Sequence, residues 1–238
     1  MMTELLYQTD AYLKEFEAQV VDHLDGGVVL DRTAFYPGGG GQPHDTGALA
    51  AADQSWPVKK VKRVKGRPVH YLHGDDLPPV GTTVAGRLDW ERRYRLMRTH
   101  TALHILCGVV WRDYEASVTG GNMDPLKGRM DFEFETMRAE LVDEIDQAIN
   151  EEVAAARPLK VEILPREEAF QIPDLIRTKI NLLPEGIQEV RTVEIEGLDL
   201  QADGGTHVAN TREVGPIHVV DYKSKGRINK RIYIELEE

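Results

Sequence analysis

Two histidines stand four residues apart in the segment RTHTALHILC, at positions 100 and 104. The residues around them have helical apolar spacing and no proline, which predicts a helix. Residues four apart share one helix face, so His100 and His104 could bind one metal ion. The glutamate that a zinc protease needs after the first histidine is replaced by Thr101. For this pair alone, two surface histidines without a metal are an equally good interpretation.

A second pair of possible ligands lies in LDLQADGGTHV, residues 198–208, where Asp203 and His207 flank two glycines. The glycines would allow a turn that directs both side chains inward. Carboxylate and imidazole are both zinc ligands, so this turn and the helix could together supply four. The alternative is that Asp203 only caps its own loop as an Asx-turn. Cys107 is a rival fourth ligand, although a lone cysteine in an apolar segment is more often a small core residue.

A third segment with possible chemistry is LDRTAFYPGGGGQPHDTG, residues 30–47. Four consecutive glycines leave backbone N–H groups open to a close ligand. Thr33 precedes this run, and Gln42 and His44 follow it. The segment is interpreted either as a ligand-facing loop or as a flexible hairpin loop.

The elements that must position these residues differ between the two parts of the chain. Turn signals at residues 25–27 and 65–68 separate short strands in the first ninety residues, which predicts a small β-barrel. Helices are predicted over 91–114 and 136–158, and strands over the segments 128–135, 159–165, 190–197, 217–224 and 231–238. The fold class is therefore α+β, with a β-barrel domain at 1–92 and an α+β domain at 93–238.

The composition describes an ordinary globular protein. The chain has 238 residues, of which 41% are hydrophobic and 29% charged, and a single cysteine excludes an internal disulfide framework. No apolar run approaches the roughly 20 residues that span a bilayer. The first residues have neither the basic segment nor the apolar core of a signal peptide. We expect a cytoplasmic protein that does not bind membranes.

The net charge of −11 argues against a nucleic-acid partner only if the charges are evenly spread. They are not, because residues 131–152 hold nine acids and one base. The rest of the chain is nearly balanced and contains three basic clusters, at 59–67, 92–98 and 223–231. Each cluster alone is most simply a solvated surface, but together they leave a polyanionic partner possible.

Four motifs in register resemble the AlaX-type alanyl-tRNA editing proteins, free-standing relatives of the editing domain of alanyl-tRNA synthetase. They are DRTAFYPGGGGQPHDTG, RLMRTHTALHILCGVV, LQADGGTHVANTREVG and KSKGRINKRIYIEL. The resemblance implies a barrel like the second domain of elongation factor Tu, followed by the editing domain of threonyl- and alanyl-tRNA synthetases. It also implies one Zn²⁺ with His100, His104 and His207 as ligands.

Asp203 departs from the family pattern, in which a cysteine stands at this place. A carboxylate also binds zinc, so the site is expected to survive with a harder ligand. Iron or manganese then become more plausible occupants. Alternatively, Asp203 orients a water or a histidine from outside the ligand set.

By the same resemblance, the chain would be an aminoacyl-tRNA deacylase that removes serine, and as a second substrate glycine, from tRNA(Ala). Thr33 would contact the serine hydroxyl and Gln42 the aminoacyl end. Residues expected near the substrate or the tRNA phosphates are Gly39, Gly40, Gly41, His44, Lys223, Lys225, Arg227, Lys230 and Arg231. The alternatives are a metal-dependent hydrolase of a small ester or amide, and a non-catalytic tRNA-binding module with a structural metal.

Overall fold

A computed structural model describes residues 2–134, 138–176 and 186–238. The chain forms two compact units, Met1–Arg95 and Leu96–Glu238. The division falls within one long helix, α1 (Trp90–Tyr114).

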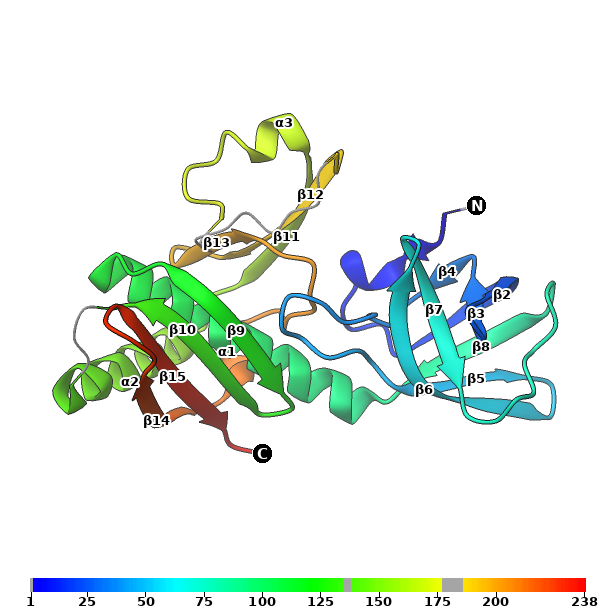
Figure 1. The fold of residues 1–238 in the computed structure, drawn as a ribbon, viewed down its shortest axis with the longest axis horizontal. Coiled ribbons are helices and arrows are strands. Elements are labelled where there is room, and N and C mark those ends of the chain that lie inside the picture. The colour runs from blue at the N-terminus through cyan, green and yellow to red at the C-terminus, as the bar shows by residue number, and fades with distance from the viewer. Residues whose placement is uncertain (1, 135–137, 177–185) are drawn as a thin grey trace. The chain divides into compact units, whose positions relative to one another are not determined.

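The first unit is a closed six-stranded barrel, as predicted (Figure 1). Its strands follow the order β2-β3-β7-β6-β5-β8 around the barrel. Their bounds are β2 (Glu15–Leu24), β3 (Gly27–Leu30), β5 (Gly47–Ala51), β6 (Gln54–Val64), β7 (Arg67–Leu72) and β8 (Thr83–Leu88). A short parallel pair, β1 (Glu4–Leu5) with β4 (Arg32–Thr33), and the 3-10 turn η1 (Leu6–Gln8) complete the unit.

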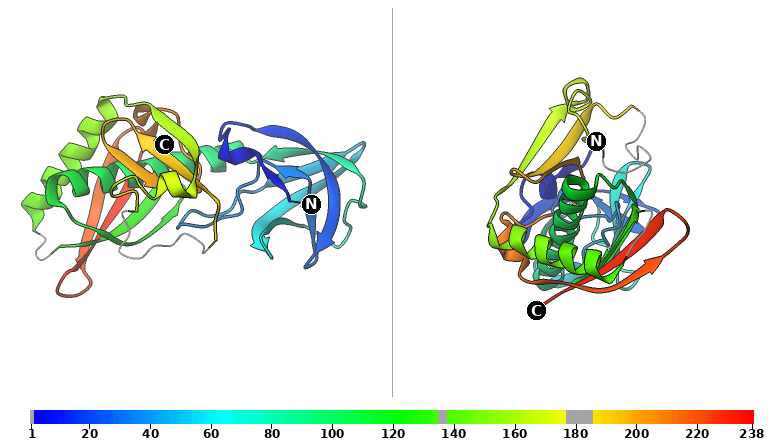
Figure 2. Two further views of the ribbon diagram at one scale, coloured as in Figure 1. Left: turned by 90° about the horizontal axis from the view of Figure 1, so that it is seen from above. Right: turned by 90° about the vertical axis from the view of Figure 1, so that its left-hand side faces the viewer.

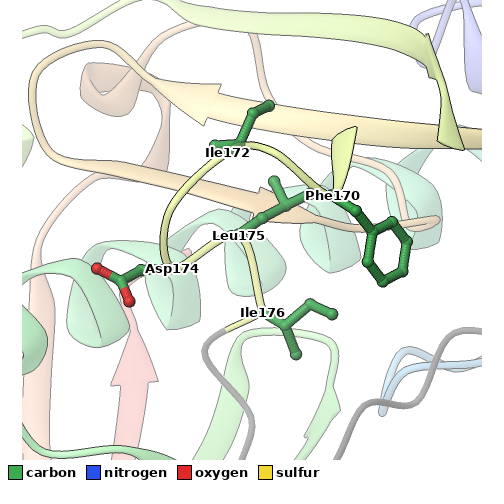
Figure 3. Close-up of a pocket in the computed structure, with 5 residues that line it drawn as sticks. All are labelled: Phe170, Ile172, Asp174, Leu175 and Ile176. Carbon is green, nitrogen blue, oxygen red and sulfur yellow. The ribbon is translucent and has the colours of Figure 1, made fainter. Parts of the chain in front are cut away.

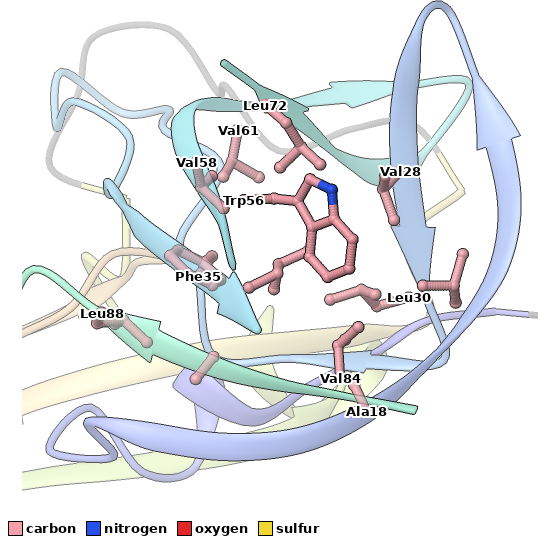
Figure 4. Packing of buried hydrophobic residues seen from close by; sticks show 13 residues of the cluster. Ala18, Val28, Leu30, Phe35, Trp56, Val58, Val61, Leu72, Val84 and Leu88 are labelled. Atoms are coloured by element: carbon pink, nitrogen blue, oxygen red, sulfur yellow. The ribbon is translucent and has the colours of Figure 1, made fainter. Parts of the chain in front are cut away.

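Two hairpins of the barrel form where the sequence predicts them. Asp25 and Gly26 join β2 to β3 with φ of 53° and 75°, and Lys65 and Gly66 join β6 to β7 with φ of 49° and 80°. Two successive positive φ angles define the tight turn whose twist matches paired strands. The barrel interior is filled by aliphatic side chains around Trp56 (Figure 4).

The second unit contains an antiparallel sheet of four strands, ordered β14-β15-β10-β9 (Figure 2). These are β9 (Val118–Asp124), β10 (Lys127–Glu133), β14 (Ile217–Ser224) and β15 (Asn229–Leu236). Helix α2 (Ala139–Ala154) packs on this sheet, where Asn150 and Asp146 bond the backbone of β14. Thr136, expected to begin this helix, lies outside the described residues.

A second antiparallel sheet, β11-β12-β13, lies on another side of α1. Its strands are β11 (Leu159–Pro165), β12 (Glu189–Ile195) and β13 (Asp199–Ala202), and two short turns, α3 (Arg166–Ala169) and η2 (Thr211–Val214), connect the unit's strands. Leu103 of α1 contacts Gly128 of β10, while Gly108 of α1 faces Asp199 of β13. Every residue from Thr99 to Val110 is therefore buried. Within the described residues, no helix is both long and apolar enough to span a membrane.

Candidate metal centre

The structure brings together four predicted ligands from segments a hundred residues apart. His100 and His104 lie on α1, and Asp203 and His207 lie in the loop after β13. One ligand atom from each of the four falls within 4.8 Å of every other. The three histidines are buried, and the Asp203 side chain is 14% exposed.

The rings are packed closely around the carboxylate. The ring centre of His207 lies 4.2 Å from that of His100 and 4.6 Å from that of His104. Nε2 of His207 lies 3.0 Å from Oδ2 of Asp203, and Nε2 of His100 lies 3.6 Å from Oδ1. Three buried imidazoles gathered around one carboxylate form a donor set that suits a divalent metal ion.

Two of the histidines have a polar neighbour at their other ring nitrogen, which is a hydrogen-bond partner for His207 and an ion-pair contact for His104. Nδ1 of His207 lies 3.2 Å from the hydroxyl of Thr101, and Nδ1 of His104 lies 3.2 Å from Oδ2 of Asp199. Metal-binding histidines characteristically give their second nitrogen to such a partner. With Nδ1 beside Asp199, Nε2 is the remaining nitrogen of His104, while Nε2 of His207 is the nitrogen that faces Asp203.

The electrostatics of His100, His207 and Asp203 favour the protonation states that bind a metal, whereas those of His104 favour its protonated ring. Burial lowers the pKa of His100 well below its ordinary value and that of His207 to about 4, so both rings are neutral at pH 7. Burial opposes ionisation of Asp203, but His100 and the hydrogen bond from His207 outweigh it and hold the Asp203 pKa well below its usual range. For His104, burial is outweighed by Asp199, which raises the pKa of His104. The four predicted ligands thus fit a metal ion.

Asp203 has two contacts besides the histidines. Its Oδ2 accepts a hydrogen bond from the Gly205 N–H at 2.6 Å, which is the Asx-turn that the sequence offered as an alternative. Nη1 of buried Arg191 lies 3.8 Å from Oδ2 and donates to the Asp203 carbonyl at 2.9 Å. Capping the loop and facing the histidines are therefore compatible roles for one carboxylate.

The sequence patterns did not predict Asp199 or Arg191 as site residues. Thr101 was noted only because it stands where a zinc protease has its glutamate. Arg191 offers a signal in the sequence, because it is the one basic residue in the strand predicted over 190–197. The structure leaves it only 7% exposed. Thr101 and Asp199 offer none in the sequence alone.

Cys107 does not belong to the cluster of possible ligands in the described chain. It is buried, and its Sγ lies 3.3 Å from Nε2 of Gln201. This agrees with the interpretation of Cys107 as a core residue rather than a metal ligand.

The glycine segment in the first unit is a tightly bonded loop. Gly38, Gly39, Gly40 and Gly41 all have positive φ, so this backbone needs glycine. Gln42 exchanges backbone hydrogen bonds with Gly39 and is buried.

Two polar residues of that segment already have partners within the unit. Thr33 is fully buried, and its hydroxyl contacts Nε2 of His70 at 2.9 Å and accepts from the Phe35 N–H at 3.1 Å. His44 is half-buried, with Nε2 3.3 Å from the Lys59 carbonyl. Their roles toward a substrate stay predictions.

The basic residues of segment 223–231 fall into two groups, those bonded to other residues and those exposed to solvent. Arg231 is paired with Asp131 across the sheet at 2.6 and 2.7 Å, and the Lys230 ammonium donates to two backbone carbonyls at 2.9 Å. Lys223 is paired with Asp221 at 2.8 Å. Lys225 and Arg227 are exposed at the β14–β15 connection.

A pocket of about 300 Å³ adjoins the strand that leads to Asp203 (Figure 3). It is lined by Phe170, Ile172, Asp174, Leu175 and Ile176. The carbonyl of Leu175 accepts a hydrogen bond from the N–H of Ala202, the residue before Asp203. None of the four predicted ligands lines this pocket.

Comparisons with known proteins agree with this architecture. Residues 6–92 match the family model described as tRNA synthetases class II (A). Residues 190–233 match the model described as the threonyl and alanyl tRNA synthetase second additional domain.

Two full-length relatives carry the same name. The alanyl-tRNA editing protein AlaX-M of Saccharolobus solfataricus is 42% identical over 236 residues, covering 98% of both chains. That of Methanosarcina barkeri is 38% identical over 241 residues, covering 99% of both. The alanine–tRNA ligase of Ignicoccus hospitalis is 40% identical over 224 residues, which cover 92% of this chain and 24% of the ligase. Similarity at this level along nearly the whole chain shows that it belongs to the family of the AlaX-M alanyl-tRNA editing proteins.

Proposed function

We propose that the chain is a trans-editing hydrolase that deacylates seryl-tRNA(Ala), with glycyl-tRNA(Ala) as a second substrate. The observation that carries this proposal is the buried cluster of His100, His104, Asp203 and His207, found in a chain of the AlaX-M family. A synthetic site gains only about 1–3 kcal/mol of discrimination from one small group, so a separate hydrolytic site has a physical purpose.

In this proposal the four residues hold one divalent metal ion, Zn²⁺ in the first instance. When bound there, such an ion would polarise an ester carbonyl or lower the pKa of a water toward about 7. Three imidazoles are neutral and one carboxylate carries a charge of −1, so a divalent ion with these four ligands would have a net charge of +1. A thiolate at position 203 would leave the same net charge, so aspartate preserves the charge of the site while supplying a harder ligand.

The remaining residues would act on the substrate rather than on the metal. The glycine loop and Gln42 would meet the aminoacyl end. Lys225 and Arg227 would contact tRNA phosphates, since among the described residues neither is paired with an acid in the way that Arg231 is. Thr33 would reach the serine hydroxyl only by exchanging its present contact with His70.

The test is deacylation of purified Ser-tRNA(Ala), Gly-tRNA(Ala) and Ala-tRNA(Ala), with metal content measured on the same preparation. We expect hydrolysis of the serine ester well above its spontaneous rate and loss of that activity in His104→Ala. The matched control is His218→Ala, because His218 is exposed and paired with Glu237 at the chain's C-terminal end. An unchanged serine ester, or a fully active His104→Ala variant, would overturn the proposal.

Two variants separate this function from its alternatives. A small-ester hydrolase would cleave free aminoacyl esters equally well after Lys225→Gln and Arg227→Gln. A non-catalytic module would bind tRNA to saturation without releasing the amino acid. Thr33→Val should slow hydrolysis of the serine ester and not of the glycine ester, since glycine has no hydroxyl to contact.

A further inference from the structure

A buried carboxylate outside the predicted ligand set lies against one of the four ligands. Asp199 opens strand β13, and its side chain has no solvent exposure. Its Oδ2 accepts a hydrogen bond from Nε2 of Gln201 at 2.6 Å. The same oxygen lies 3.2 Å from Nδ1 of His104, which is ion-pair distance but not hydrogen-bond geometry, and Nδ1 has no hydrogen-bond partner among the described residues. Burying a carboxylate is unfavourable unless it is paired or hydrogen-bonded, so a buried Asp199 beside His104 points to an interaction between the two side chains.

The position of Asp199 decides which nitrogen of His104 is available. With Nδ1 turned to the carboxylate, Nε2 is the nitrogen that remains for the other three ligands. The ring centre of His104 lies 5.1 Å from that of His100 and 4.6 Å from that of His207, so the ring is already directed into the cluster.

A glycine in α1 allows β13 to pack close to the helix beside His104. A Cβ at Gly108, one turn after His104, would lie 2.8 Å from Cγ of Leu198 and 3.0 Å from Cβ of Asp199. Real carbon atoms in contact sit at about 3.5–4.0 Å, so only glycine permits this separation. Gln201 then holds the carboxylate from its own strand.

We propose that Asp199 is a positioning residue of the metal centre: its carboxylate accepts the Nδ1–H of His104, fixes the tautomer with the lone pair on Nε2, and holds that ring toward the metal. This inference rests on the proposed function, because it assumes that the four residues bind a metal. A carboxylate in this position raises the basicity of the histidine and is commonly worth about 10–100-fold in metal affinity.

The experiment measures the affinity of metal-depleted full-length protein for Zn²⁺ by competition with a chromophoric chelator. The visible spectrum of the Co²⁺-loaded protein is recorded in parallel. For Asp199→Asn, which keeps the size of the side chain, we expect Zn²⁺ binding to weaken by about 10–100-fold and the Co²⁺ bands to shift. Asp199→Ala should weaken binding at least as much. Asp221→Asn, which removes an exposed carboxylate of β14, is the control and should match the wild type.

A double-variant cycle shows whether Asp199 acts through His104. In a His104→Ala background, Asp199→Asn should weaken Zn²⁺ binding no further, because the ring that it positions is gone. Equal weakening in both backgrounds would overturn the inference, as would wild-type affinity and an unshifted Co²⁺ spectrum in Asp199→Asn. In those cases the proposed metal centre still stands. A wild-type protein that binds neither Zn²⁺ nor Co²⁺ would overturn both proposals together.

Discussion

The buried pair of Arg93 and Asp45 anchors the glycine segment of the first unit, and its removal should be costly. Both side chains are at most 1% exposed. Nε of Arg93 donates to both carboxylate oxygens of Asp45 at 3.0 and 3.1 Å, and Nη2 also contacts Oδ2. Asp45 further accepts from the Tyr36 N–H at 2.6 Å, so one carboxylate joins the loop to the start of α1.

Among the described residues, Asp45→Ala leaves the Arg93 guanidinium with the carbonyls of Ala34 and Ala11 as its acceptors, and it removes the Asp45 acceptor of the Tyr36 N–H. Removing one partner of a buried ion pair costs about 3–5 kcal/mol, because the other charge stays buried and unpaired. We therefore expect the free energy of unfolding of the barrel to fall by about 3–5 kcal/mol.

Urea unfolding followed by the fluorescence of Trp56 measures this change. Trp56 lies in the barrel core, and replacing Trp90 and Trp111 by phenylalanine leaves it as the single emitter. Arg87→Ala, which breaks the exposed pair with Glu15, is the control and should have an effect too small to resolve. Asp45→Ala combined with Arg93→Met should cost less than the sum of the single changes. A loss below about 1 kcal/mol for Asp45→Ala, or strict additivity, would refute the reasoning.

Three further predictions concern the barrel, the metal ligand and the tRNA contact. Burial lowers the pKa of His70 to about 4, whereas an unfolded histidine titrates near 6.5. As the pH falls below about 6.5, the unfolded chain therefore takes up this proton before the folded chain does. The free energy of unfolding should then fall by up to about 1.4 kcal/mol per pH unit. Urea unfolding of His70→Gln between pH 4.5 and 7 should show a shallower fall than the wild type, and parallel curves would contradict this. Asp203→Cys should raise the preference for Zn²⁺ over Mn²⁺ in competitive binding, because thiolate is the softer ligand; an unchanged preference would argue that Asp203 does not contact the metal. Lys225→Gln with Arg227→Gln should weaken tRNA binding and reduce the salt dependence of log K by about 0.7–0.9 per lost phosphate contact, and an unchanged slope would exclude these cations.

Local structure could be predicted from the sequence where a few adjacent residues determine the backbone conformation. The turns at Asp25-Gly26 and Lys65-Gly66 formed as expected, because few residues tolerate two successive positive φ angles. The shared face of His100 and His104 follows from helix geometry alone.

Contacts between residues far apart in the sequence were harder to predict. Periodicity does not reveal how His207 returns to α1 from about a hundred residues away. Ligand chemistry indicated that the two segments could share a metal ion, and the family resemblance strengthened that expectation. Asp199 resembles any acid beside a turn until β13 packs against Gly108. Arg231 resembles a free cation in the sequence, but antiparallel pairing of β10 with β15 sets it directly opposite Asp131.

The central claim is that one metal ion held by His100, His104, Asp203 and His207 is required to cleave the aminoacyl ester. The most direct test is a titration of metal-depleted protein with Zn²⁺, in which the rate of Ser-tRNA(Ala) deacylation is measured at each addition. The account predicts a negligible rate without metal, a linear rise to one equivalent per chain, and a plateau thereafter. A full rate in the metal-depleted protein, or a rate that does not respond to the first equivalent, would contradict it.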